Sequence, residues 1–159
     1  SLDSELSKLA SSVSPKTNVQ HEDVIKMVGL SREEQAWEIQ SVILSGNTKA
    51  ALTKLSELLI VSRQPKELLM WSVVDLTRRL SAASDMLHQG ATNGEVRKAL
   101  KLFGEGGDRM ISMAKRTKPQ QLATLFTDAV AIDARTRSGN LDGQHGLEML
   151  TVRVCSAIS

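Results

Sequence analysis

The feature that most constrains the fold of this chain is one apolar stripe at helical spacing. Apolar residues recur in alternating steps of four and three at Leu69, Val73, Leu76, Leu80, Ala83 and Leu87. Pro65 precedes the stripe and suits the first position of a helix, because the N–H that proline lacks would be unpaired there. Gly90 follows the stripe. A helix over residues 65–89 would be about 37 Å long, so we expect it to form the spine of a small domain.

Helical periodicity continues through most of the chain, and no segment shows convincing strand alternation. The residues suited to helix starts are a capping box at 31–34, Asn47, Asn93, Pro119 and Asp142. The glycines at 104–107 are expected to interrupt a helix. About nine helices of unequal length, without a fixed repeat, predict an all-α fold, namely an irregular helical bundle.

The composition excludes several classes of protein. The single Cys excludes a disulfide framework and multi-cysteine metal sites, and 3% aromatic residues are too few for a base-stacking sheet. A net charge of +2 argues against a domain that coats nucleic acid. Residues 97–118 still carry seven basic and two acidic side chains, which indicates either a solvated helix surface or a weak contact with phosphate or an acidic partner. The polar N-terminus and the free Cys lead us to expect a cytoplasmic location.

Candidate sites for chemistry are few. The Gly-rich segment 104–107 lacks the Lys-Ser or Lys-Thr of a phosphate-binding loop, and no strand precedes it. Asp85 with His88, and His145 with Glu148, each lie three residues apart, which leaves a metal-binding helical bundle as a less favoured alternative. Cys155 has no base close to it in sequence and is expected to be a buried thiol. We therefore expect no catalytic residue, no cofactor and no metal.

A structural joint is predicted between the last two helices. Asp133 lies on a mostly apolar helix face, with Arg137 four residues later in the favourable order for an ion pair. A half-buried carboxylate needs partners, and the candidates are Arg137 and the N-terminal amides of the last helix. Gly139 and Glu148 complete the proposed joint. A partner interface is the alternative interpretation of Asp133.

Three segments in order resemble the C-terminal end of the DNA polymerase III delta subunit family. They are Leu122-Ala123-Thr124-Leu125-Phe126, then Asp133-Ala134-Arg135-Thr136-Arg137-Ser138-Gly139, and then Leu147-Glu148-Met149-Leu150 continuing through Arg153 to Cys155. Arg137 takes the place of the Lys that is usual in the family, which keeps the charge. Upstream, residues 45–69 resemble the helical hairpin before the family's long helix. Residues 5–24 resemble the segment that links the family's lid region to its C-terminal domain.

The resemblance implies that this chain is about half of a clamp-loader subunit. Residues 1–29 would be the end of a helical lid domain, and residues 30–159 would be the helical collar domain through which the subunit oligomerises. The N-terminal domain of AAA+ type, which grips and opens the sliding clamp, is not in this chain. The fragment would therefore be no enzyme, although its parent would belong to the DNA polymerase III holoenzyme, a DNA-directed DNA polymerase of the bacterial replisome at the nucleoid.

The implied partners are the gamma/tau and delta prime subunits of the clamp loader, which the collar would join in a ring. Arg135, Leu150 and Arg153 are the expected interface residues. Contact with the sliding clamp would be made by the missing domain only, and contact between this fragment and DNA is expected to be weak or absent. The alternatives are the collar of another clamp-loader subunit and a generic helical protein-interaction domain.

Overall fold

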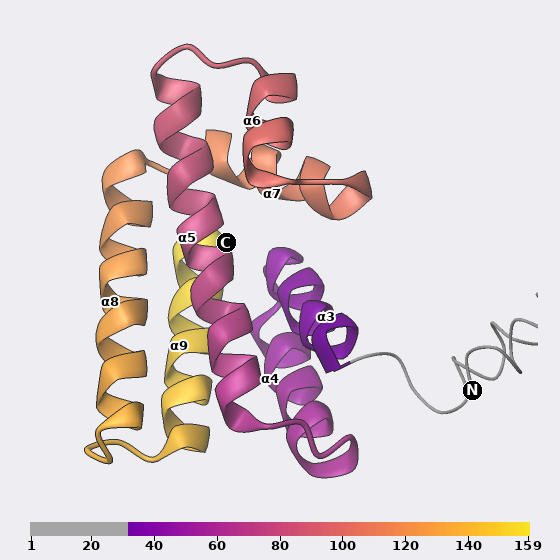
Figure 1. The fold of residues 1–159 in the computed structure, drawn as a ribbon, viewed down its shortest axis with the longest axis vertical. Coiled ribbons are helices and arrows are strands. Elements are labelled where there is room, and N and C mark those ends of the chain that lie inside the picture. The colour runs from indigo at the N-terminus through magenta and orange to yellow at the C-terminus, as the bar shows by residue number, and fades with distance from the viewer. Residues whose placement is uncertain (1–31) are drawn as a thin grey trace, which may run out of the picture. The chain divides into compact units, whose positions relative to one another are not determined.

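The computed structural model describes residues 32–159, all of whose regular elements are helices (Figure 1). They are α3 (Arg32–Leu44), α4 (Thr48–Ser56), η1 (Glu57–Val61), α5 (Lys66–His88), α6 (Asn93–Leu100), α7 (Gly104–Arg116), α8 (Pro119–Arg137) and α9 (Gly143–Ile158). The predicted all-α bundle is confirmed for this part of the chain. The predicted lid remnant at residues 1–29, and Ser31 of the capping box, lie outside the described residues.

No helix among residues 32–159 is both long enough and apolar enough to span a lipid bilayer.

The predicted spine is the central helix α5. It packs against α6, α7, α8 and α9, and in Figure 1 it runs antiparallel to α8 with α9 behind it. Five of the six apolar stripe residues are fully buried, and Leu87 at the end of the helix is partly buried. The helix α4 packs on α9, so the core lies around α5 and continues between α4 and α9.

Several helix ends follow local chemistry. Asn47 accepts a hydrogen bond from the N–H of Ala50 at the start of α4. The end of α8 is a Schellman motif, in which Gly139 adopts φ +82° and the N–H of Asn140 donates to the carbonyl of Arg135 at 2.9 Å. A positive φ is easily adopted only by glycine, which accounts for Gly139 at this position.

Three local predictions were wrong in detail. The N-cap of α6 is Thr92 and not Asn93, because Thr92 and Glu95 form a reciprocal capping box. The Gly-rich segment 104–107 does not break a helix but forms the first turn of α7. The long helix begins at Lys66, one residue after Pro65, which is its N-cap. A π-helical turn, η1, extends α4 before the loop that leads into α5, and no sequence pattern indicated it.

Candidate subunit-contact surfaces

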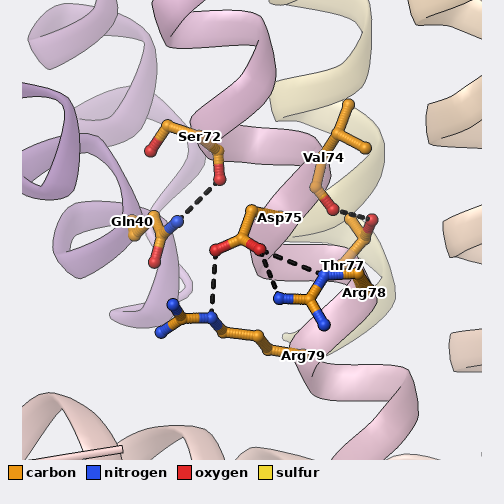
Figure 2. Close-up of polar contacts among 7 residues, drawn as sticks. All are labelled: Gln40, Ser72, Val74, Asp75, Thr77, Arg78 and Arg79. Carbon is orange, nitrogen blue, oxygen red and sulfur yellow. Dashed lines mark hydrogen bonds and ion pairs between the residues drawn. The ribbon is translucent and has the colours of Figure 1, made fainter. Parts of the chain in front are cut away.

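A buried carboxylate on α5 pairs with two arginines of the same helix. Asp75 is only 5% exposed. Its Oδ1 accepts hydrogen bonds from Nη2 and Nε of Arg78 at 2.7 and 3.1 Å, and its Oδ2 lies 3.0 Å from Nε of Arg79 (Figure 2). A buried charge needs such pairing, and both oxygens of Asp75 lie in ion pairs. Hydrogen bonds reach only Oδ1, because the contact between Oδ2 and Nε of Arg79 is an ion pair without hydrogen-bond geometry. One carboxylate faces two guanidinium groups, so the cluster keeps a net positive charge.

The same region attaches α3 to α5. The side chain of Gln40 is buried, and its Nε2 donates a hydrogen bond to the backbone carbonyl of Ser72 at 2.7 Å (Figure 2). The guanidinium of Arg79 lies 4.7 Å from the ring centroid of Trp37. Such a cation–π contact contributes about 0.5–1 kcal/mol at an exposed site. These contacts hold Trp37 in a defined place at the surface, where 41% of it is exposed.

An open groove of about 670 Å³ lies between the first half of α5 and the last half of α8, and we call it the α5–α8 groove. Its apolar lining includes Met70, Trp71 and Val74, and its polar lining includes Asp133 and Arg137. Trp71 is 56% exposed. Tryptophan, methionine and arginine are enriched in protein interfaces, so this groove has the composition of a protein contact surface.

A second, shallower hollow of about 470 Å³ lies between α4 and α9, and we call it the α4–α9 depression. It is lined by Leu52, His145, Glu148, Met149, Val152 and Arg153. Val152 is exposed despite being apolar, and Nη1 of Arg153 lies 3.0 Å from Oδ2 of Asp128 on α8. The bundle therefore presents two separate surfaces in which apolar side chains are edged by charges.

A model of a known protein family matches nearly all of this bundle. The family is described as the DNA polymerase III delta subunit, C-terminal domain, and the match covers residues 33–154, from the start of α3 almost to the end of α9. The chain belongs to this family. No curated protein and no solved structure matches the chain. Members of this family are non-catalytic components of the clamp loader.

In this delta C-terminal domain, Asp133 pairs within its own helix. Its Oδ2 lies 3.3 Å from Nη2 of Arg137. The N-terminus of α9 is capped by Asp142, whose carboxylate accepts the N–H of His145 at 3.0 Å, so the expected contact between Asp133 and these amides is not among the hydrogen bonds of the described residues. A stabilising role for Asp133, Arg137 and Gly139 at the joint stays a prediction.

Two of the predicted site residues lie elsewhere than expected. Leu150 is 0% exposed and belongs to the core, so its predicted role in contacting another subunit was wrong. Glu148 is exposed in the α4–α9 depression, and it does not line the α5–α8 groove with Asp133 and Arg137. Arg135 is exposed near the end of α8, and its predicted contact with a partner, like that of Arg153, stays a prediction.

Gly146, which was not among the predicted joint residues, packs closely against α8. A Cβ atom added to Gly146 would lie 2.6 Å from Cγ2 of Thr136 and 3.5 Å from Cγ2 of Ile132. Glycine therefore allows α9 to approach α8 closely. The available signal was a glycine inside an otherwise helical apolar pattern, which often marks close packing.

The alternative of a shared metal site does not fit the geometry. Asp85 and His88 lie near the end of α5, whereas His145 and Glu148 lie near the start of α9, at the opposite end of the α5–α9 pair in Figure 1. Within residues 32–159, no three His, Cys, Asp or Glu side chains are grouped so that they could hold a metal ion.

Cys155 is fully buried in the core. Burial raises the pKa of its thiol above the ordinary value of 9.0, and a hydrogen bond with Thr48 opposes this effect in part. A raised pKa suppresses the thiolate, which is the nucleophilic form. The position thus agrees with the predicted packing role.

Proposed function

We propose that this domain joins the chain to the gamma/tau and delta prime subunits of the clamp loader, so that the rest of the delta subunit can open the sliding clamp and load it on DNA. The observation that carries the proposal is the family match over residues 33–154. In this proposal residues 30–159 are the collar domain and residues 1–29 are the end of the lid. The subunit acts at the nucleoid as part of a DNA polymerase holoenzyme, and its own contribution is mechanical.

A member of a ring contacts two neighbours, and the two surfaces described above suit that requirement. The α5–α8 groove offers Trp71 as a large apolar anchor, with Val130 exposed on the neighbouring helix. Anchors of this kind supply most of the binding energy in protein interfaces. The Asp133–Arg137 pair supplies a charged edge, which favours the correct partner over others more than it increases affinity.

The second neighbour would bind at the α4–α9 depression. Its apolar centre comprises Leu52, Met149 and Val152, and Arg153 is paired with Asp128 beside it. A stable interface buries about 1,200–2,000 Å² in total, so each surface must extend beyond the residues named here onto the adjacent helix faces. Arg135 and Arg153 are the charged residues that we place at the edges of these contacts.

The test is co-elution of the chain with purified gamma/tau and delta prime in size-exclusion chromatography. Trp71→Ser removes the anchor of the α5–α8 groove, and Val152→Ser changes the α4–α9 depression. Each variant should weaken co-elution, and the double variant should abolish it. The matched control is Ile60→Ser, because Ile60 is also an exposed apolar residue but lies on η1, outside both surfaces.

All variants should keep the circular dichroism spectrum of the parent chain, because the three side chains are exposed. Equal co-elution of the parent chain and the double variant would refute the assignment of the two surfaces. If only Ile60→Ser lost co-elution, the contact with the partner subunits would lie on η1. Failure of the parent chain to co-elute would refute the proposed assembly itself.

A further inference from the structure

A small apolar pocket lies between α3, α5 and α7, separate from the two surfaces assigned to the ring. We call it the Trp37 pocket. Its volume is about 200 Å³, and its apolar lining includes Trp37, Leu44, Phe103 and Met110. Phe103 is 77% exposed, which is unusual for so large an apolar side chain. Trp37, which is 41% exposed, lines the same pocket, so two exposed aromatic side chains adjoin it. Contiguous exposed apolar surface of this kind is typical of an interaction site.

The charged side chains that line the Trp37 pocket are both cationic. They are Arg79 and Lys101. Arg79 shares the single carboxylate of Asp75 with Arg78, so the cluster behind the pocket keeps a net positive charge. Residues 97–118, which include Lys101, carry seven basic and two acidic side chains. The pair between Arg97 and Asp108 uses one of each, which leaves six basic side chains and one acidic side chain. The surroundings therefore complement a negatively charged partner.

One polar group on the wall of the pocket is unsatisfied. Gln40 is 2% exposed and lines the pocket. Its Nε2 donates a hydrogen bond to the carbonyl of Ser72, but its Oε1 accepts no hydrogen bond within the described residues. Figure 2 shows this oxygen directed away from Ser72, on the side of the Arg79 guanidinium. Buried polar groups are normally paired. Because this oxygen is almost completely shielded, it belongs to the wall behind the pocket and is not a contact for a side chain that enters it.

The size of the pocket limits its occupant. Pockets for small molecules and cofactors usually measure about 300–1,000 Å³, so a volume of about 200 Å³ suits a single large side chain. The mostly apolar lining favours an apolar side chain over a nucleobase, whose polar edges would need several partners. One face of the Trp37 ring is also covered by Arg79, which leaves less room for base stacking.

We propose that the Trp37 pocket binds an acidic peptide segment of a partner protein. One aromatic or aliphatic side chain of the peptide enters the pocket between Trp37 and Phe103, and its carboxylates lie beside Lys101 and the basic surface of α6 and α7. This contact is additional to ring assembly, because the pocket shares no lining residue with the α5–α8 groove or the α4–α9 depression.

The probe is a peptide-display library selected against the immobilised chain. Enriched peptides should combine one Phe, Trp, Met or Leu with neighbouring Asp or Glu, and their binding should weaken as salt is raised. Phe103→Ser and Lys101→Asn should each weaken binding of a synthesised peptide by about tenfold or more. Asn tolerates the left-handed backbone that Lys101 adopts at φ +55°, so the second variant removes charge with little strain. The control is Ile60→Ser, which lies outside the pocket and outside both ring surfaces and should leave peptide binding unchanged.

Several results would overturn the proposal. They are no enrichment, enrichment of neutral or basic peptides, or peptide binding that is unaffected by Phe103→Ser. Tighter binding of a single-stranded oligonucleotide, lost in the same variants, would assign the surface to nucleic acid. Both pocket variants should still co-elute with gamma/tau and delta prime, and loss of that assembly would make the pocket part of the ring interface. Peptide binding and co-elution are measured separately, so failure of this proposal is distinguishable from failure of the proposed function.

Discussion

Gly146 on α9 lies so close to Thr136 on α8 that a Cβ at position 146 would be 2.6 Å from Cγ2 of Thr136. Real Cβ atoms essentially never make such contacts, so a larger residue requires either the Thr136 side chain or the two helices to shift. Glycine inside a helix normally costs about 1 kcal/mol relative to alanine, and this position is therefore maintained against helix propensity.

The first prediction concerns this contact. Gly146→Ala should lower the free energy of unfolding by about 1 kcal/mol, because an overpacking cost of about 2 kcal/mol outweighs a gain in helix propensity of about 1 kcal/mol. Thermal unfolding followed by circular dichroism measures the change. Thr136→Ser removes the opposing methyl group and should restore much of the loss in the double variant. An increase in melting temperature for Gly146→Ala alone would contradict the prediction, because it would show that the contact is relieved without cost.

The second prediction concerns the buried carboxylate of Asp75. Asp75→Asn should destabilise the domain by about 2–3 kcal/mol, since it leaves the mostly buried guanidinium of Arg79 without its ion-pair partner. The matched control is Asp128→Asn, which breaks the more exposed pair with Arg153 and should cost less than about 1 kcal/mol. Denaturant unfolding of both variants gives the comparison. Equal effects would mean that the burial of Asp75 does not determine its contribution.

The third prediction distinguishes two adjacent residues at the start of α6. Thr92 accepts the N–H of Glu95 at 3.2 Å, and the Glu95 carboxylate accepts the N–H of Thr92 at 3.0 Å. Thr92→Ala should therefore cost about 1 kcal/mol, whereas Asn93→Ala should have little effect, because Asn93 is the first helical residue. Chemical denaturation measures both. If Asn93→Ala lowered the free energy of unfolding more than Thr92→Ala, Asn93 and not Thr92 would be the N-cap.

The fourth prediction concerns Cys155 and alkaline pH. The pKa of the buried thiol is raised, so the unfolded chain loses its proton at lower pH than the folded one. The stabilisation associated with the neutral thiol is fully present below the ordinary value of 9.0 and is lost as the pH rises toward the folded pKa.

The free energy of unfolding is measured from pH 7 to pH 10 for the parent chain and for Cys155→Ala. The difference between the two chains at each pH isolates the contribution of the thiol. The difference in stability should shrink above about pH 9. Native protein should also react slowly with a thiol reagent and quickly once unfolded. Rapid labelling of the folded chain, or a difference independent of pH, would contradict the burial of the thiol.

The sequence predicted the helices better than their contacts, for physical reasons. The stripe from Leu69 to Leu87 identified α5, because regular apolar spacing implies one buried helix face. Thr92 and Asn93 are both good caps, so only the observed hydrogen bonds separate them. Glycines at 104–107 have low helix propensity, yet the core residues Met110 and Ile111 stabilise α7 through tertiary packing.

The contact surfaces were less predictable, because they depend on which residues of different helices meet. Leu150 fits an apolar stripe, and only the packed bundle shows that its own chain buries it completely. Trp71 lies outside the stripe, but its exposure beside α8 depends on the packing of two helices distant in sequence. The burial of Asp75 could not be predicted from the sequence, because an acidic residue on a helix usually faces solvent.

The most direct test of the proposed assembly is the mass of the complex formed when the unmodified chain is mixed with purified gamma/tau and delta prime. Size-exclusion chromatography with light scattering provides that mass. We predict a single species that contains all the subunits and whose mass exceeds that of the same mixture without the chain. Elution of the chain alone, with the mass of the other subunits unchanged, would contradict the proposal that this domain joins the clamp-loader ring.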